Sequence, residues 1–389
     1  MNEKKIIGLG ESLHGSKTVA QSQIQIAKYL IENQQCRLIL FEMSMYDFLN
    51  YNLFIQGKFD DNKINDIINE LSISLYDPTT LVNFLLWLRE YNLKNENKVV
   101  VGGLLDINYD RLMNPLFDYL YAYYDEYTAS TIYPVLKDVY DYHLLAALQK
   151  VNNSDRLKEI MGETEYTDLL YALNMILKAL YDENLQINND KSYQENQKLA
   201  LNALFARDYS MWLVADRYIS RLSESEKAVI IAHDGHINKK TTLFPYFYSM
   251  GSFLRDKYME NYAPIGIYVG GGSITSGNIS DSIYTVIQLE HPVAGSIEEK
   301  CSKVHMPYFY YSSELLDKHN LYYRDIGWFY SPYHRIYNYG QIREKIDGFI
   351  FIDQSEASET QINDSEIYPR LMLDKLIKNR ELMETLIKN

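Results

Sequence analysis

The chain lacks the features that mark secreted, membrane-embedded or nucleic-acid-binding proteins. It has only two cysteines, Cys36 and Cys301, in 389 residues, too few for a disulfide framework, and we read both as ordinary thiols. No apolar stretch approaches the roughly 20 residues that a membrane helix needs, and the first residues lack the apolar core of a signal peptide. The formal charge of −14 argues against nucleic acid or a membrane surface as a partner. We therefore expect a cytoplasmic protein.

Several common site motifs are absent as well. We find no internal repeat, no glycine-rich phosphate loop and no cysteine-rich zinc pattern, and the glycine run at residues 270–273 is more typical of a turn than of a nucleotide site. Ser12 is not surrounded by the Gly-x-Ser-x-Gly elbow of serine hydrolases. The hydrophobic fraction of 47% is ample for a sizeable core.

Short apolar runs that alternate with amphipathic segments indicate an α/β fold. Residues 4–9 read as a buried strand, and residues 18–31 follow as a helix with apolar positions at three- and four-residue spacing. Further strand candidates are residues 37–44, 98–106, 228–232, 264–270, 282–289 and 348–353. This alternation predicts a mostly parallel central sheet flanked by helices.

A long strand-poor region interrupts the alternation. Residues 108–226 contain several runs with apolar residues at helical spacing. Because the strand pattern resumes at residue 228, we predict a large helical insertion that forms a cleft wall or lid, and not a separate domain. The predicted organisation is then residues 1–107 as the first part of the α/β core, 108–226 as the insertion, and 227–389 as the second part with a C-terminal helix.

Ionisable side chains follow the predicted strands at their carboxyl ends. Two glutamates, one aspartate and three of the eight histidines occur there. They are Glu11, His14, Glu42, Asp106, His233 and His236. Because the carboxyl ends of parallel strands meet at one edge of an open sheet, where ligands bind, we predict that these residues form a common polar site.

Structural roles for the same residues stay open. Glu11 can cap the helix that follows, with His14 as a structural histidine. His233 can be a buried histidine bonded to the backbone, and Glu42 the partner of a helix N-terminus. Three histidines and two glutamates also suit a divalent cation.

The chemistry that this constellation favours is activation of water. An imidazole is an effective general base at physiological pH when a neighbour holds the correct tautomer. We assign His14 as this base, with Glu11 or Glu42 as the orienting carboxylate. The water would attack an ester carbonyl, and His233 or His236 would stabilise the oxyanion or protonate the leaving alkoxide.

Several motifs resemble, in the same order, those of the erythromycin esterase family. GLGESLHG is similar to the family's Gly-Glu-x-x-His motif, FEMS to its Phe-Glu strand end, and AHDGHI to its His-Asn-x-His-Val turn. LLWLREYN, GGLLD, RDYSM, MGSFL and IDGFIFID resemble further family segments. The resembling segments span residues 5–353.

This resemblance implies a hydrolase, without metal or other cofactor, that cleaves an ester or lactone in a bulky apolar molecule such as a macrolide, and thus a role in antibiotic resistance. It also implies that Gln23, Asp106 and Arg207 bind substrate. Family esterases carry an arginine nine residues after the motif histidine, where this chain has Gln23. Because a cation near a developing oxyanion stabilises the transition state, we expect slow or absent macrolide hydrolysis.

Two other classes of function stay open. The site can serve a tailoring enzyme of natural-product biosynthesis that performs another acyl or peptide reaction on a small-molecule or modified-peptide substrate. The chain can also be a non-catalytic binding protein on the same fold, a class that Gln23 favours. The sequence names neither the substrate nor the oligomeric state.

Overall fold

The structure is a computed structural model in which two compact units are distinguished by their internal contacts. The described residues are 4–44, 47–58, 76–105, 154–161, 163, 166, 207–240, 249–278, 284–327, 329–330 and 336–359. The first unit comprises Met1–Glu42, Tyr51–Leu104 and Met211–Tyr368, and the second Met43–Asn50, Leu105–Ser210 and Pro369–Asn389. Nearly all of the central sheet belongs to the first unit.

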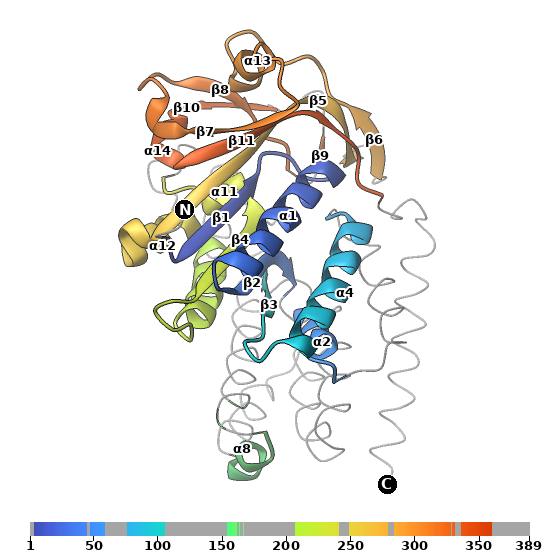
Figure 1. The fold of residues 1–389 in the computed structure, drawn as a ribbon. Helices are drawn as coiled ribbons and strands as arrows, with labels where there is room; N and C mark the ends of the chain where they lie inside the picture. The colour runs from blue at the N-terminus through green and yellow to red at the C-terminus, as the bar shows by residue number, and fades with distance from the viewer. Residues whose placement is uncertain are drawn as a thin grey trace, which may run out of the picture. The chain divides into compact units, whose positions relative to one another are not determined.

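A mostly parallel sheet of nine strands is the core of the first unit (Figure 1). Its strands are β1 (Ile6–Glu11), β2 (Cys36–Ser44), β3 (Val100–Leu105), β4 (Lys227–His233), β5 (Tyr262–Asn278), β6 (Tyr284–Gln288), β7 (Tyr308–Ser312), β9 (Phe329–Tyr330) and β11 (Gly348–Ser355). The order is β3-β2-β4-β1-β5-β11-β7, and β6 and β9 also pair with β5. Pairing is parallel between β2 and β4, β4 and β1, β1 and β5, and β5 and β11. It is antiparallel between β6 and β5 and between β7 and β11. The predicted α/β class is confirmed.

The two central strands explain how polar groups arrive at one edge. Every residue of β1 is buried, as is β4 after its first residue, as expected for parallel strands covered on both faces. Glu11 and His233 are the last residues of β1 and β4 and are partners in the strand register. The Glu11 and His233 side chains therefore lie next to each other at the carboxyl ends of the two strands.

Helices of the first unit pack beside the sheet, and several begin at a residue whose side chain accepts a hydrogen bond from a free backbone amide. The described helices are α1 (Lys17–Asn33), α2 (Asp47–Ile55), α4 (Pro78–Lys94), α8 (Asp155–Met161), α11 (Asp234–Ile237), α12 (Met250–Tyr258), α13 (Ile297–Ser302) and α14 (Ile342–Lys345), with short 3-10 turns η1 (Met259–Asn261) and η2 (Ser313–Leu315). Ser16 caps α1 by accepting a hydrogen bond from the Val19 amide at 3.1 Å, and Asp77 caps α4 in the same way. α1 packs against α4, and α11 packs against β1 and β4.

A small two-stranded sheet leads back to the loop that follows β1. β8 (Leu321–Arg324) and β10 (Tyr337–Gly340) form a separate two-stranded antiparallel sheet. Beyond β8, Ile326 makes a parallel bridge with Leu13. The Ile326 amide donates to the Ser12 carbonyl at 2.9 Å, and the His14 amide donates to the Ile326 carbonyl at 3.0 Å. A distant segment thus holds the backbone at His14.

The expected turn at residues 270–273 is wrong, because these residues lie inside β5. The glycines serve close strand pairing instead: Gly272 has φ 95°, and a Cβ there would overlap with the backbone of Ser355 on β11. A side chain would therefore separate the two strands.

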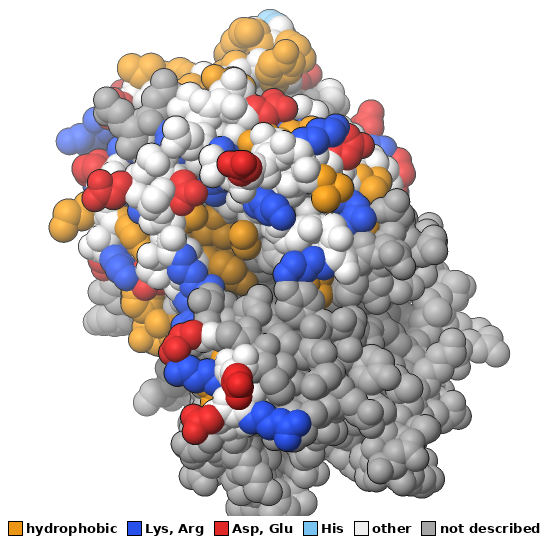
Figure 2. Space-filling model, turned by 60° about the horizontal axis from the view of Figure 1, so that its bottom comes forward, with side chains coloured by type: hydrophobic (Ala, Val, Ile, Leu, Met, Phe, Trp, Pro, Cys, Tyr) orange, Lys and Arg blue, Asp and Glu red, His pale blue; other side chains and the backbone are white. Residues whose placement is uncertain are grey.

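The predicted helical insertion lies mostly outside the described residues, as do Asp106 and the predicted C-terminal helix. Within it, Asp155–Met161 and residues 207–219 are helical, and the proposed boundaries stay predictions. Among the described helices, none has the length and apolarity needed to cross a bilayer. Among the described residues on the face in Figure 2, Lys and Arg are interspersed with Asp and Glu.

Candidate active site

Glu11 and His14 form a close pair after β1. His14 Nδ1 lies 2.5 Å from Glu11 Oε1, and the two side chains are only 12% and 10% exposed. The loop turns at Gly15, which has φ 75° and where a Cβ would overlap with the Thr275 carbonyl oxygen. Only glycine permits this turn against β5, so the backbone conformation of the loop is fixed at this point.

The surroundings of His14 favour its protonated form. Burial by itself lowers the pKa of His14, but the hydrogen bond to Glu11 and the charges of Glu11 and Glu42 outweigh it, and the pKa is raised above the ordinary 6.5. Because Nδ1 shares its hydrogen with Glu11, Nε2 is the nitrogen suited to proton transfer.

Glu42 holds the turn after β4 through both carboxylate oxygens. Oε2 accepts a hydrogen bond from the His233 amide at 2.7 Å, and Oε1 lies 3.1 Å from His236 Nε2. The helix-terminus role that the sequence left open for Glu42 is therefore present. The same carboxylate also pairs with the His236 imidazole.

His233 is held at both ring nitrogens. Nδ1 accepts a hydrogen bond from the Gly235 amide at 3.2 Å and so caps α11, while Nε2 lies 3.3 Å from Asp325 Oδ1. Burial lowers the pKa of His233, which favours the neutral ring. An acceptor Nδ1 then requires the hydrogen on Nε2, facing Asp325.

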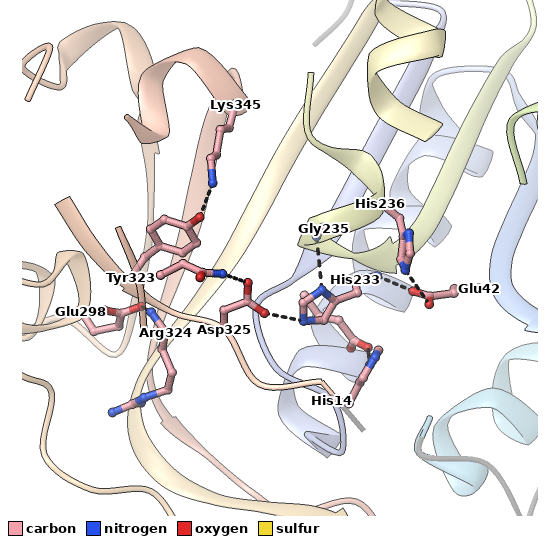
Figure 3. Close-up of polar contacts among 12 residues, drawn as sticks. His14, Glu42, His233, Gly235, His236, Glu298, Tyr323, Arg324, Asp325 and Lys345 are labelled. Atoms are coloured by element: carbon pink, nitrogen blue, oxygen red, sulfur yellow. Dashed lines mark hydrogen bonds and ion pairs between the residues drawn. The ribbon is translucent and has the colours of Figure 1, made fainter. Parts of the chain in front are cut away.

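Three imidazoles thus pair with three carboxylates at one edge of the sheet (Figure 3). The His14 and His233 ring centroids are 4.9 Å apart, with planes at 50°. Asp325 was missed from the sequence, although its place directly after the short aromatic run LYY and Arg324 resembles the other strand-end acids. No group of three or more described His, Cys, Asp or Glu residues has an arrangement that could hold a metal ion.

Of the predicted substrate-binding residues, Gln23 does not join this group. Gln23 is fully buried on α1, and its amide donates to the Leu9 carbonyl of β1 at 3.2 Å. Arg207 belongs to the second unit, and Asp106 lies outside the described residues. Their roles in substrate binding stay predictions.

Two further ionisable residues, Asp234 and Lys345, lie next to the site. Burial and the charge of Asp325 raise the pKa of Asp234 to about 8, and burial lowers the pKa of Lys345 to about 8. The Lys345 ammonium donates to the Tyr323 hydroxyl. Asp234 packs on Gly10, where any Cβ would overlap with its carboxylate. Asp234 stands where the resembling family motif has asparagine, which was the only signal for it in the sequence.

Comparison with known proteins gives the following likenesses. Erythromycin esterase type II of Escherichia coli is 20% identical over 340 residues, which cover 78% of this chain and 79% of that protein. A Bacillus cereus protein of known structure has a TM-score of 0.70 at 17% identity, covering 92% of this chain and 90% of that one.

Two further solved structures share the fold. A succinoglycan biosynthesis protein has a TM-score of 0.68 at 18% identity, covering 92% of this chain and 90% of its own. A mutant of the erythromycin esterase EreC in its open conformation has a TM-score of 0.57 at 14% identity, covering 92% of both chains. At these identities the likeness shows the fold alone.

The family model of erythromycin esterase matches residues 31–355. The match begins after Glu11 and His14, so the pairing of these two residues rests on the geometry above. Family membership supports an esterase-like hydrolase at the level of the family. With most of its length matched by the family model, the chain belongs to the erythromycin esterase family.

Proposed function

We propose that this chain is an esterase-like hydrolase in which His14 activates water for attack on an ester or lactone carbonyl. The observation that carries the proposal is the 2.5 Å contact of His14 Nδ1 with Glu11. This contact fixes the ring and directs proton transfer to Nε2. Family membership supports the hydrolase class.

Each step moves one proton. His14 Nε2 takes a proton from water as the oxygen attacks the carbonyl carbon, and Glu11 stabilises the resulting imidazolium. The carbonyl oxygen becomes an oxyanion in the tetrahedral intermediate. Collapse of this intermediate breaks the bond to the alkoxide, which takes a proton to leave as the alcohol. The proton for the alkoxide comes from His14 Nε2, while His236, which Glu42 holds at 3.1 Å, stabilises the oxyanion; alternatively His236 donates this proton, and then His14 releases its proton to solvent and His236 regains one.

The substrate we propose is an ester or lactone of a bulky, largely apolar natural product. The names of the Escherichia coli relative and of EreC support macrolides. Incubating the purified chain with a macrolide and then weighing the products by mass spectrometry tests this: hydrolysis adds one water. His14→Gln is the matched control, because it keeps a donor for Glu11 and removes the base.

Gln23 argues against rapid macrolide hydrolysis and so admits a second candidate, a tailoring enzyme that performs another acyl or peptide reaction at the same site. A neutral amide replaces the arginine expected from the resemblance, and charge-assisted hydrogen bonds are about twice as strong as neutral ones. We expect the wild-type chain to hydrolyse macrolides slowly and Gln23→Arg to hydrolyse them faster, with Gln23→Met as the uncharged control. Turnover of esters or peptides in a broad panel, with macrolides untouched by either variant, would favour the tailoring enzyme.

A further inference from the structure

The residue after β8 carries a carboxylate to the site from a distant part of the sequence. Asp325 Oδ1 lies 3.3 Å from His233 Nε2, and Asp325 Oδ2 accepts a hydrogen bond from the Asn338 side-chain amide on β10. We propose that Asp325 is a positioning residue: it sets the tautomer of His233 and, with the segment that follows, the place of His233 beside His14. Its effect on turnover rests on the function proposed above, whereas its effect on the tautomer does not.

The strand that presents Asp325 is anchored on its other side. Successive side chains of an extended strand point to opposite faces, and Arg324, only 1% exposed, is directed away from Asp325 (Figure 3). Its guanidinium donates to three carbonyl oxygens and one hydroxyl, and its backbone amide donates to Glu298 Oε1 at 2.7 Å. These acceptors are Val269, Gly270, Glu290 and the Tyr337 hydroxyl. β8 therefore has little freedom to shift.

The same segment also positions His14. The Asp325 amide donates to the Ile336 carbonyl at 3.0 Å, and the next residue, Ile326, accepts from the His14 amide at 3.0 Å. Asp325 thus contacts one histidine through its side chain, while its neighbour holds the other through the backbone. Their ring centroids lie 4.9 Å apart.

The donors and acceptors around Asp325 determine which nitrogen of His233 carries the hydrogen. A carboxylate can accept on both oxygens: Oδ2 takes a hydrogen from Asn338, and Oδ1 stands at ion-pair distance from His233 Nε2, where it attracts a hydrogen on that nitrogen. In Asp325→Asn, with the Asn338 NH₂ still directed at residue 325, the new amide oxygen faces the Asn338 donor, and the new amide NH₂ then faces His233. Nε2 has to become an acceptor, so the hydrogen moves to Nδ1, where it opposes the Gly235 amide.

Exchanging the two residues reverses this effect. In the double variant Asp325→Asn with Asn338→Asp, the new carboxylate accepts the NH₂ of residue 325, whose oxygen then faces His233. The hydrogen returns to Nε2, although the charge beside His233 has gone. The exchange variant therefore separates the tautomer of His233 from the effect of the Asp325 charge on the His233 pKa. His14, Glu42 and His236 also act on this pKa.

The experiment is nitrogen NMR of the histidine rings in the full chain labelled with ¹⁵N-histidine, with His233 assigned by loss of its signals in His233→Gln. We expect Nε2–H in the wild type, Nδ1–H in Asp325→Asn and Nε2–H again in the exchange variant. For the ester that the wild type cleaves, kcat should fall on the order of 10- to 100-fold in Asp325→Asn, as when a carboxylate that orients a histidine is removed, with KM nearly unchanged. The exchange variant should recover part of this loss.

A His233 tautomer that is the same in all three proteins would overturn the proposal. So would an exchange variant that keeps the Nδ1–H form. If Asp325→Asn does not fold, Asp325→Glu, which retains the carboxylate, must keep the Nε2–H form. A wild type that cleaves no ester would contradict the proposed hydrolase function, yet the NMR result would still decide the role of Asp325.

Discussion

At the scale of the residue, the chemistry depends on whether the His14 ring is neutral when water arrives. A base carries out proton abstraction only in its unprotonated form, and Glu11 favours the protonated one. The nearby Glu11 carboxylate therefore makes His14 a stronger base, but it lowers the fraction of His14 that is unprotonated at low pH.

Replacing His14 by glutamine should lower turnover by roughly 10²- to 10⁴-fold, the usual contribution of a general base. The glutamine amide can still donate to Glu11, so we expect the melting temperature to change little. Steady-state kinetics and thermal unfolding of the same preparation measure both quantities. A protein that unfolds with this change would assign His14 a structural role, and one with full activity would move the base elsewhere.

Replacing Glu11 by glutamine should move the acid limb of the pH profile to lower pH. In the wild type, activity rises with pH as His14 loses its proton, and its raised pKa places this rise above pH 6.5. Without the Glu11 charge, burial dominates and the pKa of His14 falls, so the base becomes neutral at lower pH. The maximum rate should fall too, because the imidazolium loses its counter-charge. An acid limb of kcat/KM that stays in place or moves to higher pH would contradict this assignment.

At the level of secondary-structure elements, the apolar strands were predicted well and the small sheet of β8 and β10 was not. Strands β1, β2, β4 and β11 are near-continuous buried runs, which a sequence shows directly. β8 and β10 are short, rich in tyrosine and form a two-stranded sheet of their own, so they lack that pattern. The nearness of Asp325 to His233 depends on this small sheet, and no local pattern in the sequence indicates it. Glu11, His14, Glu42, His233 and His236 do lie together as expected, while their catalytic roles stay predictions.

The packing of α11 on β1 gives a prediction at this scale. A Cβ on Gly10 would lie 2.8 Å from Ile237 Cγ1 and overlap with Asp234, so Gly10→Ala should push α11 away from the sheet. Overpacking of this kind costs about 1–3 kcal/mol, and turnover should fall with it because α11 carries His236. Urea unfolding measures the change in the free energy of unfolding. Gly271→Ala on β5 is the matched control, because its Cβ meets only the Gln354 side chain at ordinary contact distance. Equal stability of the two variants would contradict the packing argument.

At the scale of the whole molecule, the three carboxylates engage the three histidines one to one, and we predict that turnover needs no added metal. Prolonged chelation followed by removal of the chelator should leave kcat unchanged, with elemental analysis of the same sample as the readout. A stoichiometric cation whose removal abolishes turnover and whose return restores it would make His14, His233 and His236 candidate ligands.

The backbone bonds between His14 and Ile326 also constrain the order of events during synthesis. Residue 14 leaves the ribosome long before residue 326. The backbone around His14 therefore lacks its hydrogen bonds to Ile326 while most of the chain is being made. Domains fold as units once their last partners are present, and pairings between distant residues are slow to form. The nascent chain should therefore stay inactive until the segment around Ile326 docks. Activity then becomes a marker for completion of the fold.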